Sequence, residues 1–185
     1  MQRNKVRQTI GIDINETEIC VTQVQGTWPD PQVIKIDSEP IPHNSIKNSE
    51  VINADIIAET LRQLIDRMEL NTKSAVMSIP SRQVVTRILD IPNVPDPEMK
   101  ALLDMEVSHQ HILREEDGVY AHTNLPTTIK GRDESRQILV MASEESTLSK
   151  YREIANKAGI YLIGLEPATV AMARIASITT HARQS

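Results

Sequence analysis

The chain has 185 residues, enough for one domain or for a domain that carries a small insertion. Its net charge is -5 and aromatic residues make up 2%, so neither electrostatic attraction to nucleic acid nor base stacking on aromatic side chains is expected. The sequence shows no secretory signal and no apolar stretch long enough to cross a bilayer, and we therefore expect a cytoplasmic protein.

The first 80 residues predict a sheet and one amphipathic helix. Alternating apolar residues indicate an antiparallel meander with strands at Thr9–Ile14, Ile19–Gln25 and Gln32–Ser38 and a turn at Gly26–Pro31. Asn53 is suited to cap a helix, and apolar residues at helical spacing follow it as far as Met68. A short strand at 75–79 then ends at Pro80.

From Val84 the pattern restarts as a smaller unit. The expected elements are a strand at Val84–Ile91, a helix capped by Asp96, strands at Gly118–Leu125 and Gln137–Ala142, and a helix from Ser143 to Ala158. The polar residues 126–136 predict a mobile loop, and a strand at 161–165 with a helix from Pro167 ends the chain. Strands paired with amphipathic helices place the fold in the α/β or α+β class.

Metal and thiol chemistry are not expected. Cys20 is the one cysteine, and its place in an apolar strand predicts a small core residue. His109 and His111 are two residues apart on a predicted helix, so their side chains point about 200° apart and cannot chelate one ion. We therefore predict no metal site.

Several spaced segments carry a family resemblance. They are Ile10–Ile14, Ala75–Ser81 with Val84–Arg87, Gln110–Ile112, Ile138–Ala142 and Ala158–Pro167. In this order the chain resembles the PilM family, the cytoplasmic actin-like proteins of type IV pilus assembly, and more distantly the cell-division protein FtsA. The resemblance covers residues 7–176.

The resemblance implies an actin-like, ribonuclease H-like subdomain from residues 1–80 and 160–185. A small α+β subdomain is expected as an insertion at residues 81–159. Relatives continue into a second actin-like half with the adenosine pocket, and we expect that half to be absent from this chain.

In actin-like relatives the first hairpin binds a nucleotide phosphate, which implies phosphate contacts for Asp13, Asn15 and Thr17, with Asp13 holding a Mg²⁺-bound water. Glu16 and Glu18 argue against this site, because a carboxylate about 4 Å from a phosphate oxygen repels it by roughly 4 kcal/mol at an effective dielectric near 20. We therefore expect no catalytic residue, no cofactor and no ATP hydrolysis by this chain alone. Binding of ATP and Mg²⁺ is expected only together with a second actin-like half. Without it, Asp13 and Thr17 simply close a β-turn.

In PilM relatives the N-terminal tail of the inner-membrane protein PilN lies between the two subdomains. The resemblance thus implies a peptide groove lined by Ile79, Pro80, Arg87, Leu89 and Ile91. The protein would then be an adaptor held at the inner membrane by a PilN-like partner, with other pilus platform proteins as further candidate partners. A packed hinge without a ligand is the alternative interpretation of these residues.

Two other functions stay open. The chain could be the nucleotide-binding half of an actin-like ATPase, or the cytoplasmic lobe of a type II secretion platform protein. The latter proteins normally continue into a transmembrane helix. The sequence predicts neither an oligomeric state nor whether 185 residues is the natural length.

Overall fold

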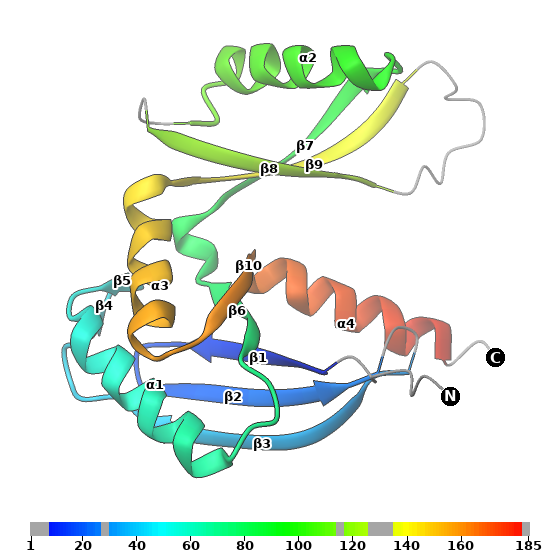
Figure 1. Ribbon diagram of the computed structural model, residues 1–185. Coiled ribbons are helices and arrows are strands. Elements are labelled where there is room, and N and C mark those ends of the chain that lie inside the picture. Colours follow the sequence, from blue (N-terminus) through cyan, green and yellow to red (C-terminus); the bar gives the residue numbers. More distant parts are fainter. Residues whose placement is uncertain (1–7, 27–29, 114–116, 126–134, 183–185) are drawn as a thin grey trace. The chain divides into compact units, whose positions relative to one another are not determined.

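The computed structural model describes residues 8–26, 30–113, 117–125 and 135–182. The chain divides into two compact units, Met1–Ser81 with Leu148–Ser185 and Arg82–Thr147 (Figure 1). The smaller unit therefore ends at Thr147, whereas the sequence predicts an inserted subdomain as far as residue 159.

Helix α3, Glu145–Lys157, explains this difference. Its Lys150 Nζ donates to the carbonyl oxygen of Val51 at 3.1 Å, and its Lys157 forms an ion pair with Asp55. Both partners lie in the larger unit, just before and within the first turn of helix α1. Local periodicity does not reveal such long-range contacts. The sequence prediction therefore assigned all of α3 to the smaller unit, whereas the structure places all but its first turn in the larger one.

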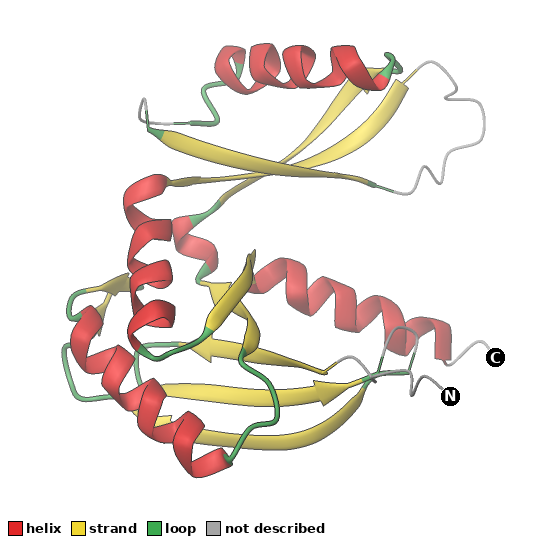
Figure 2. Ribbon diagram, viewed as in Figure 1, coloured by secondary structure: helices red, strands yellow, loops and turns green. Residues whose placement is uncertain are grey.

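The larger unit is built on a five-stranded sheet in the order β10-β6-β1-β2-β3 (Figure 2). Its strands are β1 Gln8–Ile14, β2 Glu18–Gln25, β3 Gln32–Pro40, β6 Ser74–Ile79 and β10 Tyr161–Pro167. Strands β1, β2 and β3 pair antiparallel, which confirms the predicted meander, while β6 runs parallel to both β1 and β10. The turn predicted at Gly26–Pro31 lies in part outside the described residues.

The core of this unit follows the two-residue period of the strands. The strand residues buried on the core face are Ile10, Ile12 and Ile14, Ile19 and Val21, and Ala75, Met77 and Ile79. Helix α1, Ala54–Met68, packs on β2 and β3 and buries Ile57, Ala58, Leu61, Leu64, Ile65 and Met68. With no Phe in the chain, branched aliphatic side chains and methionine fill this interior.

Polar contacts fix both ends of α1. The Asn53 side chain accepts a hydrogen bond from the backbone N–H of Ile56 at 3.1 Å, which confirms the predicted cap. At the other end Glu69 adopts the left-handed conformation, and Lys35 Nζ donates to the carbonyl oxygens of Met68 and Glu69 at 2.7 and 2.9 Å. A cation at the carboxyl end of a helix satisfies carbonyls that have no helical partner.

Helix α4, Ala168–Ala182, follows β10 and packs on β6 and β10. Its Met172 and Ile175 are 69% and 62% exposed. A small hairpin of β4, Ile46–Lys47, and β5, Glu50–Val51, precedes α1. None of the described helices combines the length and the hydropathy that a membrane crossing requires.

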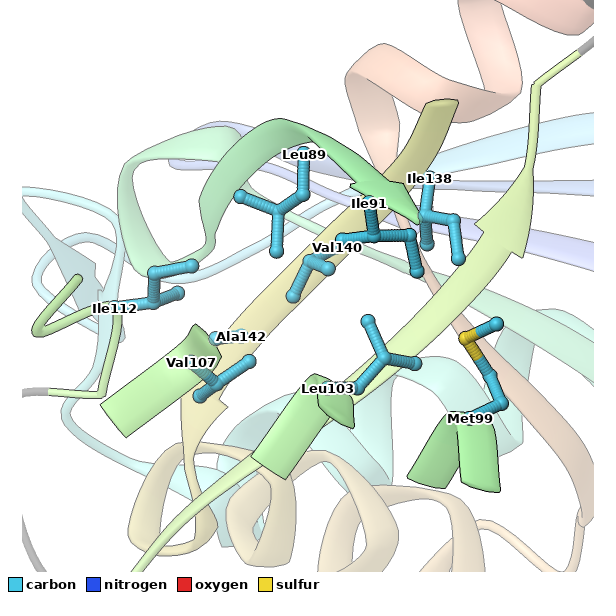
Figure 3. Packing of buried hydrophobic residues seen from close by; sticks show 9 residues of the cluster. All are labelled: Leu89, Ile91, Met99, Leu103, Val107, Ile112, Ile138, Val140 and Ala142. Atoms are coloured by element: carbon cyan, nitrogen blue, oxygen red, sulfur yellow. The ribbon is translucent and has the colours of Figure 1, made fainter. Parts of the chain in front are cut away.

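The smaller unit is a three-stranded antiparallel sheet in the order β7-β9-β8 with one helix. Its elements are the 3-10 turn Ser81–Gln83 at the entry, β7 Val85–Pro92, α2 Asp96–His109, β8 Gly118–Asn124 and β9 Ser135–Glu144. Helix α2 covers one sheet face with Met99, Leu103 and Val107, which pack with the strand residues shown in Figure 3. The other sheet face exposes Ile88 and Val119.

Three local predictions for this unit need correction. Helix α2 starts at Asp96 itself, with Pro95 at the cap position, so Asp96 is one residue inside the helix. Ser143 does not open α3, because it is still in β9 and its hydroxyl donates to the carbonyl oxygen of Gln83 at 2.9 Å. Of the loop predicted at 126–136, residues 126–134 lie outside the described part of the chain, and Arg136 belongs to β9.

Candidate functional site

A cavity of about 210 Å³ lies in the larger unit at the carboxyl end of β1. Its lining residues are Asp13, Ile14, Asn15, Glu16, Ile46, Ser49, Pro80 and Ala168. They come from the β1–β2 turn, the β4–β5 hairpin, the end of β6 and the start of α4. This is the place where the sequence predicts a degenerate phosphate site, and the structure brings Asp13 and Asn15 together there.

The β1–β2 turn is closed by the side chain of Asn15. Its Oδ1 accepts hydrogen bonds from the backbone N–H of Thr17 at 2.9 Å, from the Thr17 hydroxyl at 2.8 Å and from the backbone N–H of Glu18 at 3.0 Å. Asn15 N–H in turn donates to the Glu18 carbonyl oxygen at 3.1 Å. The donors that would surround a phosphate are therefore used inside the turn, and Thr17 is not among the residues that line the cavity.

Asn15 does not need the left-handed conformation that glycine would favour. Among the described non-glycine residues, positive φ is found at Asn44, Asn48, Ser49, Glu69 and His111. The turn closes through side-chain hydrogen bonds and needs no left-handed residue at Asn15.

The two acidic side chains of the cavity also have partners. Ser78 Oγ donates to Asp13 Oδ1, and the backbone N–H of Ser49 donates to Glu16 Oε1 at 2.9 Å. Ser78 is next to Asp13 because β6 runs parallel to β1 with Met77 opposite Ile12. A serine at the carboxyl end of a second parallel strand was a signal in the sequence that the prediction did not use.

Electrostatics in this cavity disfavour a bare anion. Its lining residues include the carboxylates of Asp13 and Glu16 and no Lys or Arg. Each carboxylate would repel a phosphate about 4 Å away by roughly 4 kcal/mol at an effective dielectric near 20. The helix dipole at the start of α4, near Ala168, attracts an anion by about 0.3–1 kcal/mol, which is too little to compensate.

Two neighbouring groups stay protonated. Burial, with the charge of Asp13 as a second cause, raises the pKa of the Tyr151 phenol above its ordinary value. Burial also raises the pKa of the Cys20 thiol, and the charges of Glu18 and Asp13 add to this effect. A protonated, partly buried thiol is a poor nucleophile. No group of three His, Cys, Asp or Glu side chains suited to a metal ion occurs within the described ranges.

We predict that Asn15→Ala lowers the free energy of unfolding by about 1–2 kcal/mol, since it removes the acceptor of three hydrogen bonds. Asn15→Asp keeps the acceptor oxygen and serves as the matched control, with a loss expected below about 0.5 kcal/mol. Urea denaturation of the three proteins measures this difference. Equal stability of Asn15→Ala and the parent protein would show that the turn is held by other contacts.

The residues predicted for the partner groove divide between the units. Ile79 is buried at the end of β6, and Pro80 lines the cavity beside Asp13. Arg87 is exposed on β7. The groove itself stays a prediction.

Leu89 and Ile91 need a correction, because they are 3% and 1% exposed and belong to the core of the smaller unit (Figure 3). They cannot present their side chains to a peptide while that unit is folded. The exposed apolar residue of β7 is Ile88, at 58%, one position out of register with the prediction. Strand alternation shows that one of the two sets is buried, but only the position of α2 decides which.

Comparison with known proteins settles the family. The family described as type IV pilus assembly protein PilM matches residues 11–181. The chain belongs to the PilM family. A solved PilM-PilN type IV pilus biogenesis complex contains a chain with the same fold, at 17% identity and a TM-score of 0.74, covering 86% of this chain and 47% of the other.

Two further solved structures match the chain. The cytoplasmic domain of EpsL, an inner-membrane component of the type II secretion system of Vibrio cholerae, matches at 13% identity and a TM-score of 0.53, covering 87% of this chain and 57% of the other. A Bacteroides thetaiotaomicron protein with an actin-like ATPase fold and unknown function matches at 11% identity and a TM-score of 0.37, covering 86% and 51%. The PilM family chain thus spans about half the length of these structures. The first two matches confirm a fold shared with the chain of the PilM-PilN complex, of the predicted mixed α/β class.

Proposed function

We propose that this PilM family protein is a non-catalytic adaptor that binds the N-terminal cytoplasmic tail of a PilN-like inner-membrane protein. The family match over residues 11–181 carries the proposal. The solved PilM-PilN complex supplies the class of partner. An adaptor of this kind would be held at the inner membrane through its partner, since a bound tail tethers it to a membrane-anchored protein.

The geometry of the β1–β2 turn supports the absence of ATP turnover by this chain alone. The turn donors are used internally by Asn15, and the cavity holds two carboxylates. Actin-like enzymes hold a nucleotide between two lobes, so that one lobe can neither orient it fully nor exclude water from it. The adaptor function needs neither step.

Fluorescence anisotropy tests the proposal. A dye-labelled peptide of about 20 residues from the N-terminus of a PilN-like protein of the same organism is titrated with the purified chain. We expect saturable binding with a Kd in the micromolar range, roughly -8 kcal/mol. A peptide of the same composition in scrambled order is the control. No saturation by several hundred micromolar, or equal binding of the scrambled peptide, would contradict the adaptor function.

Thermal unfolding with Mg-ATP tests the non-catalytic part of the proposal. A ligand at 100 times its Kd stabilises a protein by about 2.7 kcal/mol, which raises the Tm of a chain of this size by about 5 °C or more. We expect no such shift at millimolar Mg-ATP. A rise of several degrees that Mg²⁺ alone does not produce would restore the ATPase interpretation.

A further inference from the structure

Strand β8 forms an open edge of the sheet in the smaller unit (Figure 1). It pairs with β9 on one side, and no other described strand pairs with it. Residues 121–124 are all exposed. A strand covered on one face alternates between buried and exposed side chains, so this run shows that the second half of β8 is uncovered. The unpaired backbone N–H and C=O groups of an edge strand can accept another strand.

The other edge strands of the five-stranded and three-stranded sheets carry the usual protections, which are a proline, a bulge or charged side chains. Strands β3 and β10 each contain a register shift and end in a proline. Strand β7 also ends in a proline, and Arg87 and Asp90 are exposed along it. Strand β8 has none of these features. Its residues pair one to one with β9, and its sequence GVYAHTN contains no Pro, Lys, Arg, Asp or Glu.

The sequence of β8 complements itself when two copies pair antiparallel. With a two-fold axis at Ala121, this residue lies opposite Ala121 of the second copy. Val119 then lies opposite Thr123, and Tyr120 lies opposite His122. Opposed residues of an antiparallel pair are in contact, and β-branched and aromatic pairs are favourable. No like charges meet, because β8 carries no Lys, Arg, Asp or Glu.

The length of the strand selects this register. A two-fold axis at Ala121 pairs all 7 residues of β8 with the second copy. An axis at Tyr120 or at His122 leaves two residues of each strand unpaired. The Tyr120 ring is also held toward α2, because its hydroxyl donates to Asp104 Oδ1 at 2.6 Å. Its side of the strand is therefore fixed before a second strand arrives.

We propose that β8 is a self-association surface, through which two copies of this chain pair antiparallel about a two-fold axis at Ala121. Their two three-stranded sheets then form one continuous sheet. The occupant is a second copy, because the match depends on two identical strands related by symmetry. This inference goes beyond the proposed adaptor function and does not depend on it.

A charge swap at the axis tests the pairing. Ala121→Lys and Ala121→Asp each place two like charges opposite each other, and because Ala121 is exposed both variants are expected to fold. Sedimentation equilibrium of the parent chain should show a monomer–dimer equilibrium between about 1 and 500 μM. Each variant alone should raise the dimer Kd at least about fivefold. An equimolar mixture of the two variants should dimerise at least as well as the parent, since opposite charges then meet at the axis.

Ile88→Lys is the matched control. Ile88 is 58% exposed on β7, at the opposite edge of the same sheet, so the dimer Kd should stay within about twofold of the parent value. Amide exchange in residues 119–123 should become slower as the concentration of the parent chain rises, as expected for new main-chain hydrogen bonds.

Three results overturn the proposal. They are a parent chain that stays monomeric over the whole concentration range, a mixture of Ala121→Lys and Ala121→Asp that does not recover dimerisation, and a dimer that Ile88→Lys weakens and Ala121→Lys does not. The last result would assign the contact to the exposed sheet face in place of the strand edge. No partner tail is present in these measurements, so none of their outcomes bears on the adaptor function.

Discussion

Leu103→Ala is expected to lower the free energy of unfolding of the smaller unit by about 3–5 kcal/mol. Leu103 is 0% exposed at the centre of α2 and packs among buried strand residues of β7 and β9 (Figure 3). The described buried residues of the smaller unit form a single hydrophobic cluster, so this part of the unit has few other contacts with which to compensate for a cavity. Truncation should therefore unfold a large fraction of the unit.

The matched control is Met105→Ala. Met105 lies on the same helix but is 58% exposed, and a change below about 0.5 kcal/mol is expected. Because the two units need not unfold in one transition, amide exchange in β9 is measured, which reports on the smaller unit alone. Similar exchange rates in both variants would show that α2 contributes little to the stability of this unit.

Tyr151→Phe is expected to raise the free energy of unfolding by about 1 kcal/mol, an unusual direction for a core substitution. Tyr151 is 1% exposed, and its hydroxyl has no hydrogen-bond partner among the described residues. A buried hydroxyl without a partner loses its hydration and gains no bond in return. The ring itself fills the interior beneath α3, so Tyr151→Ala should lower the stability by about 3–5 kcal/mol.

The pH dependence gives an independent check on Tyr151. Burial raises the pKa of its phenol in the folded state, so the folded protein holds this proton more tightly than the unfolded chain. The contribution of this proton to the free energy of unfolding is fully present below the ordinary tyrosine pKa of about 10. It is lost as the pH rises above that value. Tyr151→Phe should therefore reduce the loss of stability on the alkaline side in urea denaturation at pH 8–11. A lower stability of Tyr151→Phe at neutral pH would mean that the hydroxyl has a favourable partner.

Most of the regular structure could be predicted from local patterns. The meander, the cap at Asn53 and the helix that follows it depend on alternation, helical spacing and one capping side chain. These signals act over a few residues and therefore appear in the sequence itself. Ser143 was misassigned because a polar residue before a helical pattern resembles a cap, although pairing with β8 extends β9 through it.

The candidate site was predicted in part. Asp13 and Asn15 lie at the end of β1, where the hairpin was predicted, and a phosphate site there stays a prediction. The use of the Thr17 donors by Asn15 depends on the turn geometry. Ser49 and Ala168 line the same cavity from distant parts of the chain. Their contribution requires the β4–β5 hairpin and α4 to fold against the sheet, which no short-range pattern records.

The sequence by itself determined the secondary structure, the order of the elements and the family, because periodicity, capping and spaced segments are properties of the chain alone. The tertiary structure decided which face of β7 is buried. Helix α2 packs on the face that carries Leu89 and Ile91, so these two residues are buried and Ile88 on the opposite face is exposed. It also decided that all but the first turn of α3 belongs with the larger unit and forms a groove with β10. Burial and edge exposure depend on what packs against a strand, and the partners of a strand come from residues far away in the chain.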